Sequence, residues 1–387
     1  MKELINKLNL QDRHVLTKQL IQAGYAFAAW KMPLQNEITF IISLKGAYQL
    51  NDFLLTDLGQ GFLINRYSDN HPIKPHYISA DLVIKSDDIL LNPKITSGEI
   101  DEFKSELDNQ ENVEKEQVRS KIQEQTPSDF EHNVSRAVEE IRNGSFEKVV
   151  LSRYKDEELP DDFSPWKFFE GICEKYNNSF CSITYIPDQG LWIGATPELL
   201  ISDDSQHFRT VSLAGTKHLT EDQTLSEIAW TQKEIEEQAF VSRYVINCFK
   251  KIRLREFHEH GPKTIQAGNL AHLKTEFIVD YAEVSFDGLA DQMLELLHPT
   301  SAVCGMPIEQ TKPWISQVEN YDREFYSGFL GPVNLENKID LFVNLRCMKV
   351  SNGIVRFYAG AGITEDSSPH KEYEETEMKM NILKGLI

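Results

Sequence analysis

Two side chains, Lys148 and Glu198, have sequence surroundings suited to proton transfer. Lys148 lies in the strand-like run EKVVLSR (147–153), where burial beside β-branched residues would lower the pKa of the amine and make it a base. Glu198 follows Pro197 in GATPELLI, and apolar neighbours would keep its carboxyl protonated and able to donate a proton. Each pattern also fits an ordinary solvated side chain, a lysine on the wet face of a strand and a glutamate in a loop.

Pairs of carboxylates three residues apart occur in two segments. Glu234 and Glu237 lie in WTQKEIEEQ, and Glu372 and Glu375 lie in KEYEETEMK near the C-terminus. If these segments are helical, each pair lies on one helix face. Oxygen ligands of this kind suit a hard cation such as Mg²⁺. Taken alone, each pair also fits the solvated face of an acidic helix, whereas two such helices together favour a bridged metal.

Glycine-rich stretches follow two strand-like runs, SLAGTK (212–217) and YAGAGIT (358–364). Such stretches let backbone N–H groups approach an anion closely, although glycines often only form a turn. Arg346 and Lys379 are near these stretches in the sequence or follow them, and Arg346 could bind a carboxylate with two hydrogen bonds. His298 begins HPTSAVCGMP, where a histidine is more often structural than catalytic.

The elements that must position these residues alternate without a regular strand–helix repeat. Helical spacing predicts a helix from 126–128 to 143–144, a second from 164 to 176 and a long one from about 225 to 252. The run at 38–46 and several runs after 147 predict strands. Residues 86–126 are charged and poor in aromatic residues, which fits a solvated helix or a mobile connection. The mixture favours an α+β fold with antiparallel sheet over a parallel one.

The composition bounds the function. The 387 residues include 40 Lys and Arg against 60 Asp and Glu, a formal net charge of −20, so we expect no nucleic-acid partner and no anionic membrane. Five cysteines form no C-x-x-C pair, which argues against disulfides and structural zinc and favours the cytoplasm. We expect no leader sequence and no membrane span. A doubly negative substrate would therefore need positive charge that is local to its site.

An ordered series of motifs resembles the chorismate-utilising enzymes, a family of isochorismate synthases, salicylate synthases and the large subunits of anthranilate and aminodeoxychorismate synthases. The resemblance implies a large antiparallel two-sheet sandwich flanked by helices. It covers residues 126–387 as the chorismate-binding catalytic region, while residues 1–125 would be an N-terminal variable part packed into the same fold. The motifs are EKVVLSR, GATPELL, SLAGT, WxxKExxE, LAHLKT, HPTSAVCGMP, DREFYSGFLGP, LRC, YAGAGI and EYEExxxK.

The resemblance also implies roles for individual residues. Mg²⁺ would be held by Glu237 and Glu375, with Glu234 and Glu372 close by, and would bind the ring carboxylate of chorismate. At two positions this chain departs from the usual pattern, with Gln238 where His often follows the glutamate and Tyr373 where Trp is common. The groups implied to grip or surround the substrate are Arg346, Lys379, the backbone of Gly215, Gly360 and Gly362, and the side chains of Thr216, His298, Tyr326 and Leu345.

Two positions select one reaction within the family. Lys148 stands where the ammonia-using members have Gln, and Ala214 stands where aminodeoxychorismate synthases have a nucleophilic lysine. Water is therefore the expected nucleophile, and the expected enzyme is an isomerase, an isochorismate synthase. In this reading Lys148 activates the water that attacks ring carbon 2, and Glu198 protonates the hydroxyl that leaves carbon 4. Salicylate synthase and a non-catalytic chorismate-binding relative stay open as alternatives, as does the choice between menaquinone and siderophore pathways. We expect a monomer without a glutaminase subunit.

Overall fold

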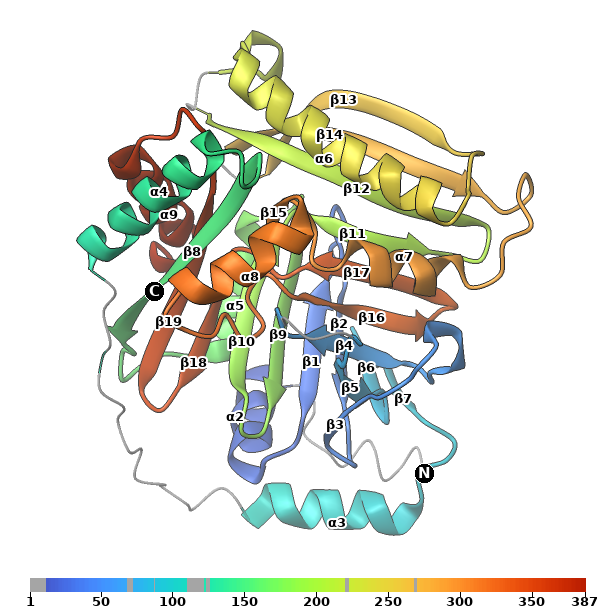
Figure 1. Ribbon diagram of the computed structural model, residues 1–387. Helices are drawn as coiled ribbons and strands as arrows, with labels where there is room; N and C mark the ends of the chain where they lie inside the picture. Colours follow the sequence, from blue (N-terminus) through green and yellow to red (C-terminus); the bar gives the residue numbers. More distant parts are fainter. Residues whose placement is uncertain are drawn as a thin grey trace.

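Two large antiparallel sheets pack face to face (Figure 1). The computed structural model describes residues 12–67, 72–86, 88–109, 122, 126–219, 223–267 and 270–387. In spatial order, the ten-stranded sheet contains β15 (Gly305–Met306), β8 (Lys148–Glu158), β19 (Ile354–Ile363), β18 (Cys347–Ser351), β10 (Gly190–Thr196), β9 (Phe180–Ile186), β1 (Phe27–Lys31), β2 (Ile38–Ile42), β6 (Leu82–Lys85) and β7 (Asp88–Leu91). The nine-stranded sheet contains β13 (His258–Ala267), β14 (Leu270–Asp280), β12 (His207–His218), β11 (Leu199–Asp203), β17 (Lys338–Val343), β16 (Phe329–Leu335), β4 (Gly61–Asn65), β5 (His76–Ser79) and β3 (Ala47–Gln49).

Helices cover the outer faces of both sheets (Figure 1). Apolar side chains of α2, α3 and α5 pack in one core cluster with the ten-stranded sheet, and α6 and α7 do the same with the nine-stranded sheet. Helices α4 and α8 pack against β8. The helices are α2 (Arg13–Ala23), α3 (Ser97–Asp108), α4 (Pro127–Arg142), α5 (Pro165–Lys175), α6 (Gln232–Lys251), α7 (Leu289–Leu297), α8 (Ile308–Val318) and α9 (Pro369–Lys384), with short 3₁₀ helices η1 (Leu55–Asp57) and η3 (Leu225–Glu227).

Aromatic side chains fill the space between the sheets. The rings of Phe180 and Phe342, which come from opposite sheets, stack with their centroids 4.2 Å apart. Trp192 stacks on Tyr358, and Tyr358 stacks on Tyr326. These rings belong to one buried cluster, and such rings contribute both large apolar area and defined geometry. The α+β class and the antiparallel two-sheet architecture expected from the sequence are confirmed.

Two expected elements differ from the structure. The helix expected over 225–252 is divided into η3 and α6, because Thr224 and Thr231 each form a capping box with the glutamate three residues later, so the chain starts a helical turn twice. The segment 86–126 contains a strand, β7, and the helix α3, rather than only a solvated helix or a connection. The residues of this segment beyond 109, apart from 122 and 126, lie outside the described part of the chain.

Residues before 126 supply strands to both sheets. β1 pairs with β9, and β4 pairs with β16, so early and late parts of the chain share each sheet. The division of the chain near residue 125 stays a prediction.

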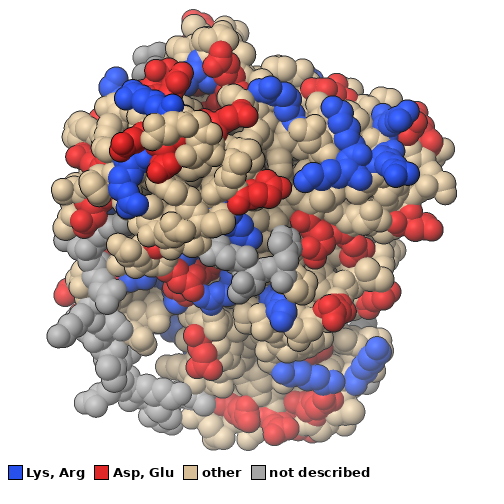
Figure 2. Space-filling view, viewed as in Figure 1, with Lys and Arg blue, Asp and Glu red and all other residues tan. Residues whose placement is uncertain are grey.

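Acidic and basic side chains are interspersed over the face shown in Figure 2. All five cysteines are buried and free. Among the described helices, none is long and apolar enough to cross a membrane.

Candidate active site

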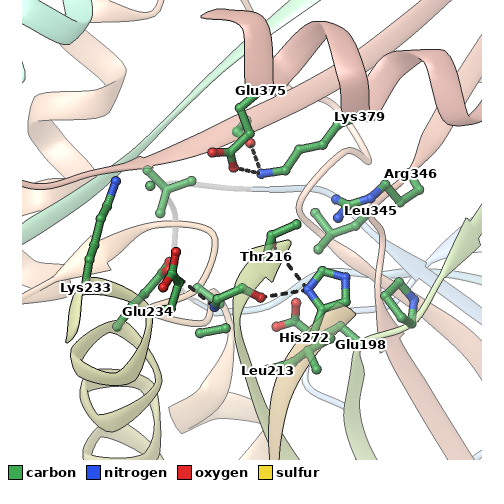
Figure 3. A pocket seen from close by; sticks show the side chains of 18 residues that line it. Glu198, Leu213, Thr216, Lys233, Glu234, His272, Leu345, Arg346, Glu375 and Lys379 are labelled. Carbon is green, nitrogen blue, oxygen red and sulfur yellow. Dashed lines mark hydrogen bonds and ion pairs between the residues drawn. The ribbon is translucent and has the colours of Figure 1, made fainter. Parts of the chain in front are cut away.

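A polar cavity lies where both sheets meet α6 and α9 (Figure 3). Strands β8 and β19 of one sheet and β12 and β14 of the other contribute to its walls, and the two helices contribute carboxylates and lysines. The lining residues are Val150, Pro197, Glu198, Leu213, Ala214, Gly215, Thr216, Lys233, Glu234, Glu237, His272, Ala302, Leu345, Arg346, Gly360, Gly362, Glu375 and Lys379.

Glu198 and Arg346 both lie where the chain crosses from one sheet to the other. Glu198 lies between β10 and β11, and Arg346 lies between β17 and β18. Backbone hydrogen bonds join the two crossings, since the Ala195 N–H donates to the Arg346 carbonyl at 3.0 Å and the Val343 N–H donates to the Glu198 carbonyl at 2.9 Å. The two side chains are thus presented to one cavity by paired, rigid backbone.

Burial gives Glu198 the properties of a proton donor near neutral pH. Its exposed fraction is 5%. Burial raises the pKa of its carboxyl to about 7, although the positive charges of Arg346 and Lys148 lower it in part. A carboxyl with this pKa holds its proton through much of the range in which an enzyme works. The alternative of a solvated loop glutamate is excluded by its burial.

Lys148 is also buried, with an exposed fraction of 3%. Its ammonium contacts the Glu237 carboxylate of α6, with 2.7 Å between Nζ and Oε1. Gly362 makes this contact possible, since a Cβ at that position would lie 2.9 Å from the Lys148 Cε. Gly215, at φ +67°, donates its N–H to the other Glu237 oxygen at 3.3 Å. Burial raises the pKa of Glu237, but the charge and hydrogen bond of Lys148, together with the charges of two further lysines, outweigh burial, so the pKa is lowered.

The carboxylates of α9 differ in exposure to the cavity. Glu375 lines it and pairs with Lys379 at 2.6 Å. Burial raises the pKa of Glu375, but the charge and hydrogen bond of Lys379, together with the charge of Lys233, outweigh it, so that the pKa is lowered. Glu372 is buried behind the wall, 3.6 Å from the Lys233 ammonium, and burial followed by the charge of Glu375 raises its pKa.

Glu234 has a structural partner that we did not predict from the sequence. Its carboxylate accepts the Thr231 N–H at 2.7 Å and so completes the cap of α6, while it also lines the cavity. Gln238, the departure from the family pattern, is buried beside this face. Its amide donates to the Ser212 carbonyl at 3.2 Å and to the Thr275 hydroxyl at 3.0 Å, which fastens α6 to β12 and β14.

The donor set fits Mg²⁺. Among the described residues no group of three or more His, Cys, Asp or Glu side chains converges as a metal site. Mg²⁺ is usually held by one or two carboxylates together with water and substrate oxygens. Glu237 and Glu375 offer two ionised carboxylates on facing helices of one cavity, which matches that requirement.

His272 is a functional candidate that the sequence reasoning missed. It lines the cavity from β14, and its Nδ1 lies 2.9 Å from the Gly215 carbonyl. Because a carbonyl only accepts, Nδ1 carries the proton and Nε2 is an acceptor. Nε2 is buried and has no hydrogen-bond partner among the residues that the structure describes. Burial and then the Arg346 charge lower the pKa of this imidazole to about 4, so it stays neutral. An alternating strand such as LAHLKT gives no sign of this role.

Two expected substrate contacts do not line the cavity. His298 packs edge-on against Phe329 and lies 3.0 Å from the Asn65 amide, so its ring is used within the core. Tyr326 is buried and stacks on Tyr358 of β19, and its hydroxyl would lie 3.0 Å from a Cβ at Gly360. The other expected contacts do line it, namely Gly215, Thr216, Leu345, Arg346, Gly360, Gly362 and Lys379.

Comparisons with known proteins agree with this geometry. Residues 63–387 match the family model described as "Chorismate binding enzyme". The isochorismate synthase EntC of Escherichia coli K12 is 31% identical over 271 residues, 68% of each chain. The vibriobactin-specific isochorismate synthase of Vibrio cholerae is 27% identical over 274 residues, 69% of this chain and 68% of that protein.

Solved structures of relatives share the fold. The menaquinone-specific isochorismate synthase MenF from Escherichia coli superposes with a TM-score of 0.77 at 19% identity, covering 94% of this chain and 89% of that one. The anthranilate synthase component I from Streptococcus pneumoniae gives a TM-score of 0.66 at 19% identity, covering 92% of this chain and 89% of that chain. On the family match and the similarity to EntC, the chain belongs to the chorismate binding enzymes.

Proposed function

We propose that this protein is an isochorismate synthase that converts chorismate reversibly to isochorismate. The observation that carries the proposal is a buried carboxyl of raised pKa, Glu198, in the cavity lining together with a buried lysine, Lys148, whose ammonium contacts the lining carboxylate of Glu237. Two similar proteins are isochorismate synthases named for different pathways, one vibriobactin-specific and one menaquinone-specific. This supports the same product here. The five free, buried thiols support a reducing compartment such as the cytoplasm.

The two groups would act in opposite directions. Lys148, in its neutral form, takes a proton from water as the oxygen bonds to ring carbon 2. The ring double bonds shift, and the hydroxyl leaves carbon 4 as water with the proton that Glu198 supplies. A general acid or base contributes roughly 10²–10⁴-fold each. The reaction is reversible because bonds of the same kinds are made and broken.

The remaining residues would bind and orient the substrate. Arg346 and Lys379 provide positive charge for its carboxylates. The unpartnered Nε2 of His272 would accept a hydrogen bond from a hydroxyl of the ring, which is a hydrogen bond that only a neutral imidazole can make. Leu213 and Leu345 would pack on the ring and exclude water.

We propose that Glu237 and Glu375 hold Mg²⁺, with Glu234 and Glu372 supporting them. When bound, the ion would grip the ring carboxylate and supply charge beside it. Local charge supports this proposal. Three cations line the cavity and Lys148 adjoins it, which makes four positive charges. The ionised carboxylates in the lining are three, Glu234, Glu237 and Glu375, when the protonated Glu198 is left out. This small excess would not balance a substrate with two carboxylates.

The test is a proton NMR time course of chorismate with the purified protein, first with Mg²⁺ and then with EDTA. Isochorismate that reaches a plateau without pyruvate, and only with the metal, is the expected result. Stoichiometric pyruvate with salicylate would assign the chain to the salicylate synthases. Unchanged chorismate in both buffers would refute both enzymatic assignments and leave a non-catalytic chorismate-binding protein.

A further inference from the structure

The strand that carries Lys148 runs near the edge of its sheet. Its outer neighbour, β15, has only two residues, Gly305 and Met306, which lie opposite Val149 and Lys148. The Val150 N–H still reaches the Cys304 carbonyl, at 2.9 Å. Beyond this point β8 continues to Glu158, but no other described strand pairs with this side of it. Its next outward backbone groups need other partners.

A buried ion pair supplies those partners. Arg323 donates from Nη2 to the Val150 carbonyl at 2.9 Å. Glu319 accepts the Ser152 N–H at 2.6 Å and the Ser152 hydroxyl at 3.0 Å. Residues 150 and 152 are the two that an outer antiparallel strand would bond. Two side chains therefore continue the ladder that β15 begins.

The same guanidinium also reaches the loop that forms the next wall of the cavity. Arg323 donates from Nη1 to the Val303 carbonyl at 2.8 Å. Val303 directly follows Ala302, which lines the cavity. Its Nε and Nη2 donate to the two carboxylate oxygens of Glu319 at 2.7 and 2.6 Å. Its Cζ lies 4.3 Å from the centre of the Tyr67 ring. Arg323 thus fixes β8 and the 299–304 loop to each other.

We propose that Glu319 and Arg323 are positioning residues for the reaction, which hold Lys148 against the cavity by replacing a strand at the edge of β8. The proposal rests on the proposed function, since it concerns the base of that reaction. Lys148 is two residues from Val150, and its Nζ contacts the Glu237 carboxylate that lines the cavity, so a shift of this strand moves the amine. Misplacing a reacting group by about 1 Å costs up to about 10²-fold in rate.

A stabilising role alone would not require an ion pair. Both side chains are almost fully buried, with exposed fractions of 7% for Glu319 and 3% for Arg323. Replacing a buried ion pair by apolar residues of similar size is often neutral or stabilising, whereas removing one partner leaves an uncompensated charge. A double substitution therefore separates position from stability.

The experiment compares the double variant Glu319→Leu/Arg323→Met with the wild type in chorismate turnover with Mg²⁺. We expect kcat to fall about 10- to 100-fold, with KM changed less than about threefold because Arg346 and Lys379 lie on other elements. Hydrogen exchange of the peptide that contains residues 148–152 should become faster. Arg323→Lys keeps the charge but offers no planar fork, and its kcat should also fall.

The matched control is Asp156→Leu/Arg356→Met, which removes the bidentate ion pair between Asp156, near the far end of β8, and Arg356 of the neighbouring strand β19. Its kcat should remain that of the wild type. A folded Glu319→Leu/Arg323→Met protein with wild-type kcat would overturn the proposal, and so would equal losses of kcat in the control. If the double variant does not fold, the kcat of Arg323→Lys decides in the same way. A wild type that leaves chorismate unchanged would refute the proposed function instead, and hydrogen exchange at 148–152 would still report whether the pair holds the strand.

Discussion

The raised pKa of Glu198 makes a prediction about stability that is independent of activity. The substitution Glu198→Gln keeps the shape of the side chain and removes its titration. In the wild type the pKa rises from 4.5 to about 7 on folding because the carboxyl is buried. The folded chain therefore binds more protons than the unfolded chain between these values, and this group lowers stability as the pH rises through that window. The glutamine variant lacks this loss.

The magnitude follows from the shift. One pKa unit corresponds to about 1.4 kcal/mol, so between pH 5 and pH 8 the free energy of unfolding of the variant should gain about 2–3 kcal/mol relative to the wild type. Other titrating groups are present in both proteins and largely cancel in the difference. Chorismate turnover should fall by roughly 10²–10⁴-fold, because the amide has no proton to give.

Urea denaturation of both proteins at the two pH values measures this difference, with Glu174→Gln on the exposed face of α5 as the control. The control should show no change in its difference from the wild type between the two pH values. A Glu198→Gln variant that gains nothing at pH 8 over pH 5 would refute the assignment of Glu198 as a buried proton donor, even if the variant were inactive.

Three further predictions concern turnover. In the wild type kcat/KM should fall as the pH rises above about 7, since Glu198 must be protonated to act; a flat profile from pH 6 to pH 9 would contradict this role. Arg346→Gln should raise KM at least about tenfold by loss of a carboxylate contact, and should move the inflection of kcat/KM to higher pH, because the Arg346 charge lowers the pKa of Glu198; an unmoved inflection would argue against their coupling. Gly362→Ala should lower kcat about 10²-fold or more, because its Cβ would displace the Lys148 side chain. Gly171→Ala in the helix α5, where nothing lies within 4 Å, should leave kcat intact and should not lower the melting temperature, because alanine favours a helix over glycine.

Local signals allowed the sequence to predict much of the fold. Thr126 and Pro127 mark the start of α4 because a capping box and a first-turn proline depend only on neighbouring residues. The strand at Lys148 was predicted for the same kind of reason, although it extends farther than expected, to Glu158. The break between η3 and α6 was missed because the prediction relied on helical periodicity alone. It did not use the capping box at Thr231, which marks a second helix start.

The site was less readable, because its decisive features involve residues far apart in the chain. Nothing near His272 in the sequence shows that its Nδ1 bonds to the Gly215 carbonyl and that its Nε2 has no partner in the described part of the chain. His298 was predicted to contact the substrate because it lies in a family motif, but its ring packs in the core against Phe329. The capping bond of Glu234 is local and could have been inferred from Thr231 three residues earlier.

The pairing of lysines with carboxylates explains how an acidic chain builds a site for an anion. Lys148 of β8 neutralises Glu237 of α6, and Lys379 neutralises Glu375 one helical turn away. Each lysine lowers the pKa of its partner against the effect of burial, so both carboxylates stay ionised and available to a cation. Arg346, in contrast, has no carboxylate at ion-pair distance among the described residues, which leaves its guanidinium for the substrate. The net charge of −20 therefore says little about this cavity, where the order of charges along α6, α9 and the sheet crossings determines what can bind.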